Sequence, residues 1–302
     1  MRALRVQVPA SAANLGPGFD TLALALDLHN ELVVEVIDAN LEFQVEGEGE
    51  GRLPTDASNM IARAAYRLFR TVGTPPPGMR IRSTNRIPLG SGLGSSAAAI
   101  VAGLMAADAI AETKMKREQL LEIAWEMEGH ADNVAAAIFG GLTIVGQSSS
   151  SLMTAQIPIA PMRFAIVTPE IELPTRAMRD ALPRNVTLSD AALNLGRMGL
   201  MIEALRQGDF DLLSRAAEDR LHEPYRALLI PGCSEARSAG LEAGAAAVTL
   251  AGAGPGLIAF ALDSHEAIAE AMASAFNSHG LTVRKFVLDP EPQGARLLHT
   301  AH

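Results

Sequence analysis

Three glycines spaced two residues apart stand between a predicted strand and a predicted helix. The run RIPLGSGLGSSAAAIV places Gly90, Gly92 and Gly94 just before Ser95 and Ser96. Glycine accepts φ > 0 and lets the backbone approach a ligand, and the serines can cap a helix whose positive end faces that ligand. The pattern predicts a cradle for an anion such as a nucleotide phosphate. It lacks the lysine of a Walker A loop and the third glycine of GxGxxG, and a glycine-rich turn without a ligand is the alternative.

A cluster of carboxylates and polar side chains ends a later predicted helix. The run EMEGHADN contains Glu126, Glu128, His130 and Asn133, and Glu122 lies one helical turn earlier. Such carboxylates can hold Mg²⁺, which takes oxygen ligands and usually keeps water and phosphate in its other positions. A solvated acidic face, and a histidine that only caps or hydrogen-bonds its neighbours, are the alternatives.

Two further loops combine small residues with polar groups. The run PASAANLGPGFD can present Asn14 and Asp20 to a polar substrate, and turn chemistry beside a solvated acid explains it equally well. The loop Gly252–Gly256 lies between two apolar strands, where missing side chains allow close backbone approach. A tight strand connection without a ligand is the alternative there.

Arginines near prolines complete the candidate groups. Arg176 and Arg179 follow Pro174, and Arg226 follows Pro224. A guanidinium fork suits a carboxylate or a phosphate. Surface salt bridging is the ordinary alternative.

These groups need elements that position them, and hydrophobic periodicity predicts such elements. Strands are predicted at residues 4–8, 31–37, 42–46, 79–87, 163–168, 245–250, 257–262 and 282–288. Helices, the first preceded by a possible capping residue at Asn59, are predicted at residues 60–72, 95–112, 117–128, 189–207, 210–219, 233–242 and 265–279. This order lacks the steady βαβ repeat of a doubly wound sheet. A Ser-rich, Pro-containing stretch at 146–161 then divides an α+β protein into predicted domains at 1–155 and 156–302.

Composition narrows the class of protein. Of 302 residues, 48% are hydrophobic and 20% charged, which excludes disorder for most of the chain. The formal charge is 25 − 34 = −9 without any run of Lys and Arg, so we expect no nucleic-acid partner. The longest apolar stretch, Ala97–Ala107, is too short for a membrane span. With one cysteine, Cys233, and no signal-peptide pattern, we expect a cytoplasmic protein without disulfides.

Taken together and in this order, the motifs resemble those of the GHMP small-molecule kinases. The runs that carry the resemblance are PASAANLGPGFD, PLGSGLGSSAA and GAGP. Within that superfamily, EGHADNVA at 128–135, LPTR at 173–176 and HEPYRALLIP at 222–231 resemble the homoserine kinase family. The match extends from residue 6 to about residue 262.

The resemblance implies a fold and an activity. The fold is a two-domain α+β GHMP kinase fold, with an N-terminal domain like ribosomal protein S5 and a ferredoxin-like C-terminal domain. The activity is the ATP-dependent phosphorylation of the hydroxyl of L-homoserine on the way to threonine, with Mg²⁺ as cofactor. Because the family is commonly dimeric, a homodimer is also expected.

The resemblance further implies roles for individual residues. The residues expected to bind ATP are Pro88, Leu89, Gly90, Ser91, Gly92, Leu93, Gly94, Ser95, Ser96 and Asn59. The residues expected around homoserine are Asn14, Asp20, His130, Asn133, Thr175, Arg179 and Arg226. The arginines would hold the α-carboxylate and Asp20 the α-ammonium. Ser96 and Glu128 would share Mg²⁺, with Glu122 and Glu126 as alternatives, and together with Asn133 they form the expected catalytic group.

Asn133 is expected to orient the attacking hydroxyl, because an amide cannot accept a proton at neutral pH, and Asp132 can support it from behind. Positioning and charge stabilisation carry most of phosphoryl transfer. The chain departs from the family pattern at Ala136, which replaces a proline, and at Ala251 and Gly256, which replace hydroxyl residues. The role of the third loop therefore stays open. Another kinase of the superfamily, and a silent relative that only binds ATP and a metabolite, remain as alternatives.

Overall fold

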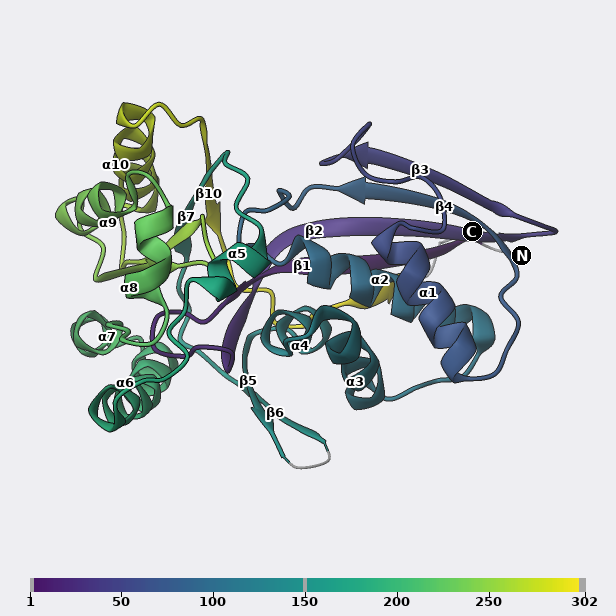
Figure 1. Ribbon diagram of the computed structural model, residues 1–302, viewed down its shortest axis with the longest axis horizontal. Helices are drawn as coiled ribbons and strands as arrows, with labels where there is room; N and C mark the ends of the chain where they lie inside the picture. The colour runs from purple at the N-terminus through teal and green to yellow at the C-terminus, as the bar shows by residue number, and fades with distance from the viewer. Residues whose placement is uncertain (1–2, 149–150, 299–302) are drawn as a thin grey trace.

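Two β-sheets, each packed against helices, form the framework of the protein (Figure 1). The computed structural model describes residues 3–148 and 151–298. The first sheet contains β1 (Leu4–Ala13), β2 (Leu22–Ile37), β3 (Leu41–Gly47), β4 (Gly78–Asn85), β5 (Leu142–Gln147), β6 (Leu152–Ile157) and β11 (Arg296–Leu298). The second sheet contains β7 (Phe164–Pro169), β8 (Ala247–Leu250), β9 (Leu257–Phe260) and β10 (Val283–Leu288).

The first sheet is organised around the long hairpin of β1 and β2. Its strand order is β11-β1-β2-β4-β3, and β5 pairs with β2 and with β6. All these pairs are antiparallel except β3 with β4. The register of β1 against β2 shifts between Pro9 and Ala10, so the far half of the hairpin leaves the regular sheet and carries its loop toward the second domain.

The second sheet follows the chain order strand, helices, strand, strand, helix, strand. Its spatial order is β10-β7-β9-β8, with antiparallel neighbours throughout. This is the βαββαβ arrangement of ferredoxin-like domains. The predicted α+β class and the ferredoxin-like second domain are therefore confirmed.

Helices cover one face of the first sheet and flank the second (Figure 1). Those of the first half are α1 (Met60–Thr71), α2 (Ser95–Ala111), α3 (Arg117–Glu128) and α4 (Asp132–Phe139). Those of the second half are α5 (Thr175–Asp180), α6 (Leu188–Gln207), α7 (Phe210–Ala216), α8 (Glu223–Arg226), a 3₁₀ turn (Ala227–Leu229), α9 (Cys233–Glu242) and α10 (His265–Ser278). Among the described residues, no helix is long and apolar enough to cross a membrane.

Helix α2 is the central element of the first domain. It is apolar around much of its circumference because it packs against β1, α1, α3 and α4, and most of its residues are buried. At Gly103 a Cβ atom would lie 2.2 Å from the carbonyl oxygen of Ile61, so only glycine permits this close contact with α1. The packing holds the N-terminal end of α2 at the junction of the two domains.

The predicted elements are all present, most of them within a few residues of their expected ends. The exceptions are β2, which begins nine residues before the predicted strand at 31–37, and β1, which continues five residues past its predicted end. Helices α4, α5 and α8 and strands β5, β6 and β11 were not predicted. Strand β6 runs across residue 155, and β11 returns to the first sheet beside β1. The domain limits of 1–155 and 156–302 stay a prediction beside these observations.

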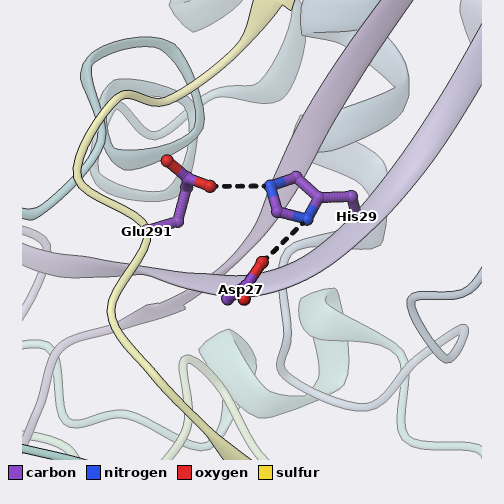
Figure 2. A group of neighbouring side chains, drawn as sticks. All are labelled: Asp27, His29 and Glu291. Atoms are coloured by element: carbon purple, nitrogen blue, oxygen red, sulfur yellow. Dashed lines mark hydrogen bonds and ion pairs between the residues drawn. The ribbon is translucent and has the colours of Figure 1, made fainter.

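Hydrogen bonds and ion pairs connect the C-terminal segment around Glu291 and Arg296 to β2 of the first sheet (Figure 2). The ring of His29 on β2 has Nε2 3.0 Å from Glu291 Oε2 and Nδ1 3.2 Å from Asp27 Oδ1. Arg296 Nη2 donates to the same Glu291 oxygen at 3.0 Å. Although these are metal-ligating residue types, a guanidinium already neutralises Glu291, and we interpret the cluster as a structural fastening.

Candidate active site

A pocket lies where the first-domain motifs meet the loops of the second domain. It is lined by Asn14, Asp20, Gly90, Ser91, Gly92, Gly94, Ser95, Ser96, Glu128, His130, Asp132, Asn133, Leu173, Arg179, Arg226, Gly252, Ala253 and Gly254. The structure therefore brings together most of the predicted site residues. Of the others, Pro88, Leu89 and Asn59 line neighbouring cavities, and Leu93 is buried in the core. Thr175 begins α5, and its side chain lies outside the described part of the structure.

The glycine loop needs glycine for two different reasons. Gly90, Gly92 and Gly94 have φ values of +64°, +82° and +70°, in the left-handed region that disfavours side chains. A Cβ at Gly92 would also lie 2.1 Å from the carbonyl oxygen of Ala251, and one at Gly94 2.2 Å from Ser11 Oγ. The loop is thus bent and pressed against both domains.

The expectation that the serines cap α2 is wrong. Gly94 is the N-cap residue, without a side-chain cap, and Ser95 and Ser96 are the first residues of the helix. The left-handed conformation of Gly94 turns the chain directly into the helix, so neither hydroxyl is needed for capping. Both serines line the pocket instead, at the end of α2 where unpaired backbone N–H groups favour an anion.

The third loop joins the first two motifs. Gly252 N donates to the carbonyl oxygen of Ala13 at 3.0 Å, and Asn14 Nδ2 donates to the carbonyl oxygen of Gly252 at 2.7 Å. Gly256 N donates to the carbonyl oxygen of Ser91 at 3.2 Å, and a Cβ at Gly256 would lie 2.4 Å from that oxygen. Glycine at this position, a departure from the family pattern, therefore suits a loop that supports the glycine cradle from the second domain.

Two side chains that could ligate a metal ion through oxygen lie next to each other, one on α2 and one on α3. Ser96 Oγ donates to Glu128 Oε2 at 2.7 Å, and both side chains line the pocket. Glu126 instead pairs with Arg67 on the outer surface, and Glu122 is exposed away from the pocket. Of the three candidate carboxylates, only Glu128 lies beside a second oxygen ligand. A hydroxyl and a carboxylate are the kind of ligand that Mg²⁺ takes.

Asp132 organises two of the predicted substrate residues. Its Oδ1 accepts a hydrogen bond from Asn133 N at 2.8 Å and lies 3.2 Å from His130 Nδ1. Burial opposes protonation of His130, but the hydrogen bond with Asp132 and the charges of Asp132 and Glu128 raise its pKa. Ser11 Oγ donates to Asn133 Oδ1 at 2.9 Å and so fixes that amide from the other side.

Two arginines line the pocket and differ in hydrogen-bond partners, burial and the direction of their pKa shifts. Arg179 donates to both carboxylate oxygens of Asp20, at 3.0 and 2.8 Å, and this hydrogen bonding raises its pKa. Arg226 is 1% exposed, and burial together with the charge of Arg179 lowers its pKa. Its Nη2 has no hydrogen-bond partner among the described residues. Arg176, by contrast, is exposed on the outer side of α5.

A second cavity of about 270 Å³ also borders the start of α2. It is lined by Asn30, Leu53, Pro54, Asn59, Met60, Ile61, Ser83, Asn85, Leu89, Gly90, Ser95, Ser96 and Ala99. Asn59 uses its side chain for the fold, because Oδ1 accepts from Ile61 N and Nδ2 donates to the carbonyl oxygen of Pro54. The cavity shares Gly90, Ser95 and Ser96 with the first pocket.

Sequence reasoning missed some residues that complete the site. Ser11 lies in the run PASAANLGPGFD, but nothing local to it indicates that it would hold Asn133. Leu173 lines the pocket from the loop before α5, and His222 lies behind Arg226. The four-residue spacing of His222 and Arg226 is compatible with one shared helical turn, but it does not show what the histidine contacts.

Comparison with known proteins agrees with this geometry. The chain matches the model of the GHMP kinases N terminal domain at residues 59–141 and that of GHMP kinases C terminal at residues 201–279. It is 42% identical to a homoserine kinase of Moorella thermoacetica over 291 residues, 96% of this chain and 98% of that protein. The chain belongs to the homoserine kinase family.

Other members of the homoserine kinase family agree in length and shape. A homoserine kinase of Caldanaerobacter subterraneus subsp. tengcongensis is 40% identical over 98% of this chain and 96% of its own length. The crystal structure of homoserine kinase from Cytophaga hutchinsonii superposes with a TM-score of 0.89 at 33% identity, covering 99% of this chain and 98% of that one. The predicted two-domain GHMP kinase fold and the resemblance drawn from the motifs are confirmed.

Proposed function

We propose that this protein transfers the γ-phosphoryl group of ATP to the hydroxyl of L-homoserine. The observation that carries the proposal is one pocket that is lined both by the charged side chains of Asp20, Arg179 and Arg226 and by the start of α2. Arg226 offers a buried guanidinium with an unused Nη2, which suits an α-carboxylate. Asp20 offers a carboxylate for an α-ammonium. The family relationship over nearly the whole chain points to the same substrate.

The nucleotide side is built from backbone rather than from cationic side chains. The start of α2 and the bent loop before it supply N–H groups and the positive end of a helix dipole for the phosphates of ATP. The adjoining cavity beside Asn59 is the proposed place for adenine. Binding by backbone N–H groups suits a protein whose net charge is −9, because such a site can hold an anion locally although the protein as a whole is acidic.

The donor set also fits Mg²⁺. Ser96 and Glu128 supply a hydroxyl and a carboxylate side by side at the helix start, and both face the pocket. When bound, the ion would neutralise charge on the phosphates. We propose these two residues as its protein ligands.

Asn133 is proposed to orient the attacking hydroxyl. With Oδ1 held by Ser11 and its backbone N–H held by Asp132, the amide keeps one orientation and leaves Nδ2 to donate to the substrate oxygen. That hydrogen bond directs a lone pair of the hydroxyl toward the phosphate bound at α2. Such positioning of two reactants is a large part of what phosphoryl transfer requires from a protein.

A coupled assay of ADP release across a panel of alcohols tests the proposal. We expect release that depends on L-homoserine and Mg²⁺, and none above background with mevalonate, galactose or shikimate. Activity with one of the other alcohols and none with homoserine would assign a different kinase activity. Binding of ATP and homoserine without ADP release would indicate a silent binding protein.

A homodimer and a cytoplasmic location are further proposals. The first rests on the family resemblance and the second on a chain with one cysteine. Light scattering on the purified protein would test the first, with a mass near twice 31.8 kDa expected.

A further inference from the structure

A completely buried histidine lies directly behind the arginine proposed to bind the substrate carboxylate. His222 is the N-cap residue of α8 and precedes Arg226 by four residues, one helical turn. Its side chain is 0% exposed and does not line the pocket, so it cannot touch the substrate. Asp219 Oδ2 accepts hydrogen bonds from His222 N and Glu223 N, both at 2.7 Å, and so holds this turn in place.

The partners of the ring assign its two nitrogens. Nε2 lies 2.8 Å from the carbonyl oxygen of Gly16, which can only accept, so Nε2 carries the hydrogen. Nδ1 lies 3.2 Å from Arg226 Nη1, which can only donate, so Nδ1 is the acceptor. Phe19 stacks on the ring at 5.1 Å between centroids and lies 5.2 Å from the Arg226 guanidinium. Histidine and arginine therefore both pack against the ring of Phe19.

These contacts leave one end of the guanidinium for a ligand. Arg226 Nη1 is held by His222, and Nε donates to the carbonyl oxygen of Met178 at 3.3 Å. Among the described residues Nη2 has no partner, and Arg226 lines the pocket. A guanidinium fixed at two of its three nitrogens loses little freedom when an anion binds to the third.

We propose that His222 is the positioning residue that sets Arg226 for an α-carboxylate and thereby makes the site select amino-acid alcohols. The inference rests on the proposed function and adds the device behind its carboxylate specificity. The same ring also donates a hydrogen bond to Gly16, in the loop that carries Asp20. It therefore connects Arg226, proposed to bind the carboxylate, with the loop of Asp20, proposed to bind the ammonium. No other side chain of the described residues contacts both Gly16 and Arg226 by hydrogen bonds.

Two amide substitutions separate the two contacts of the ring. Gln places its amide near the position of Nε2, so His222→Gln keeps a donor for Gly16 and loses the acceptor for Arg226. Asn places its carbonyl near Nδ1, so His222→Asn keeps the acceptor for Arg226 and loses the donor for Gly16. The matched control is His265→Gln, because His265 is a buried histidine of α10 outside the pocket, and its one hydrogen bond within the described residues is to the carbonyl oxygen of Ala261.

The readout is discrimination between L-homoserine and 3-aminopropan-1-ol, which lacks the carboxylate. For His222→Gln we expect the ratio of kcat/KM for the two alcohols to fall about 10- to 100-fold, as for loss of a hydrogen bond to a charged group. We expect an unchanged KM for ATP, a smaller fall for His222→Asn, and wild-type ratios for His265→Gln. Equal losses for both alcohols, or a ratio unchanged in His222→Gln, would overturn the inference.

A measurement without turnover separates this inference from the proposed function. In the full-length protein labelled with [¹⁵N]histidine, we expect His222 to show a protonated Nε2 and an unprotonated, hydrogen-bonded Nδ1. Replacing Arg226→Met should shift the Nδ1 resonance toward that of a free nitrogen. A protonated Nδ1, or no shift in the variant, would overturn the positioning role even where homoserine is turned over. Failure of wild-type turnover with the expected spectra would instead count against the proposed function alone.

Discussion

Arg179 and Asp20 form a two-pronged ion pair across the pocket, with nitrogen-oxygen distances of 3.0 and 2.8 Å, although 159 residues separate them in the chain. Each side chain is a little over one-third exposed. At that exposure an ion pair adds little to stability, about 0–1 kcal/mol. The pair therefore matters more for the site: donors of Arg179 are used on Asp20, which leaves Arg226 as the proposed ligand of the substrate carboxylate.

Replacing Asp20→Asn should weaken recognition of the substrate ammonium. Asn tolerates the left-handed conformation of this position, where φ is +51°, so the loop should keep its shape. We expect kcat/KM for L-homoserine to fall about 10- to 100-fold while that for 4-hydroxybutyrate, which lacks the ammonium, stays near its wild-type value. Steady-state kinetics with both alcohols measures this. A parallel loss for both would show that Asp20 acts on something other than the ammonium.

Replacing Glu128→Gln should raise the Mg²⁺ concentration needed for half-maximal activity, by about tenfold or more, because a neutral amide is a poorer ligand than a carboxylate. A titration of ADP release against Mg²⁺ at fixed ATP measures the change. Glu126→Gln is the matched control on the same helix, since Glu126 pairs with Arg67 away from the pocket. Equal shifts in both variants would refute Glu128 as the ligand.

Local sequence encoded much of the fold. Helix-start signals and apolar runs predicted α1, α2 and α3 to within a residue, and Asn59 is the N-cap of α1 as expected. Helix α4 was missed because it has eight residues, nearly all apolar, and begins three residues after Gly129 ends α3. So short a run contains no helical periodicity to detect.

The site was harder to predict, because its decisive contacts join distant parts of the chain. The glycine pattern indicated that the backbone at Gly92 can take a positive φ, but only the fold shows that Gly92 packs against Ala251. The bond from Asn14 to Gly252 spans 238 residues, and no local pattern records it. The roles of single residues were inferred from the family resemblance. The observed contacts are compatible with these roles, which the substitutions proposed for Asp20, Glu128 and His222 would test.

The only cysteine should be unreactive in the folded protein. Burial raises the pKa of Cys233 to about 11, whereas a free thiol titrates near 8.5. At pH 8.5 the folded protein thus holds fewer than about 1 in 100 of its thiols as thiolate. Ellman's reagent should react slowly with native protein and at once in guanidinium chloride; equal rates would show that Cys233 is exposed. The unfolded thiol loses its proton first, so this group should also lower stability as pH rises from about 8.5 toward 11.

Two alanine substitutions within the glycine loop separate backbone strain from steric conflict. Gly90 has positive φ, and a Cβ added there would meet no atom within 4 Å beyond its two chain neighbours, so Gly90→Ala should cost only the left-handed strain, about 1–2 kcal/mol. Gly92→Ala carries the same strain and places Cβ 2.1 Å from the backbone oxygen of Ala251, so it should cost more, about 2–5 kcal/mol in all. Thermal unfolding measures both. Because the conflict pushes the third loop from the cradle, Gly92→Ala should also raise the KM for ATP more than Gly90→Ala does. Equal effects of the two variants on stability and on KM would show that the contact between the loops is not needed.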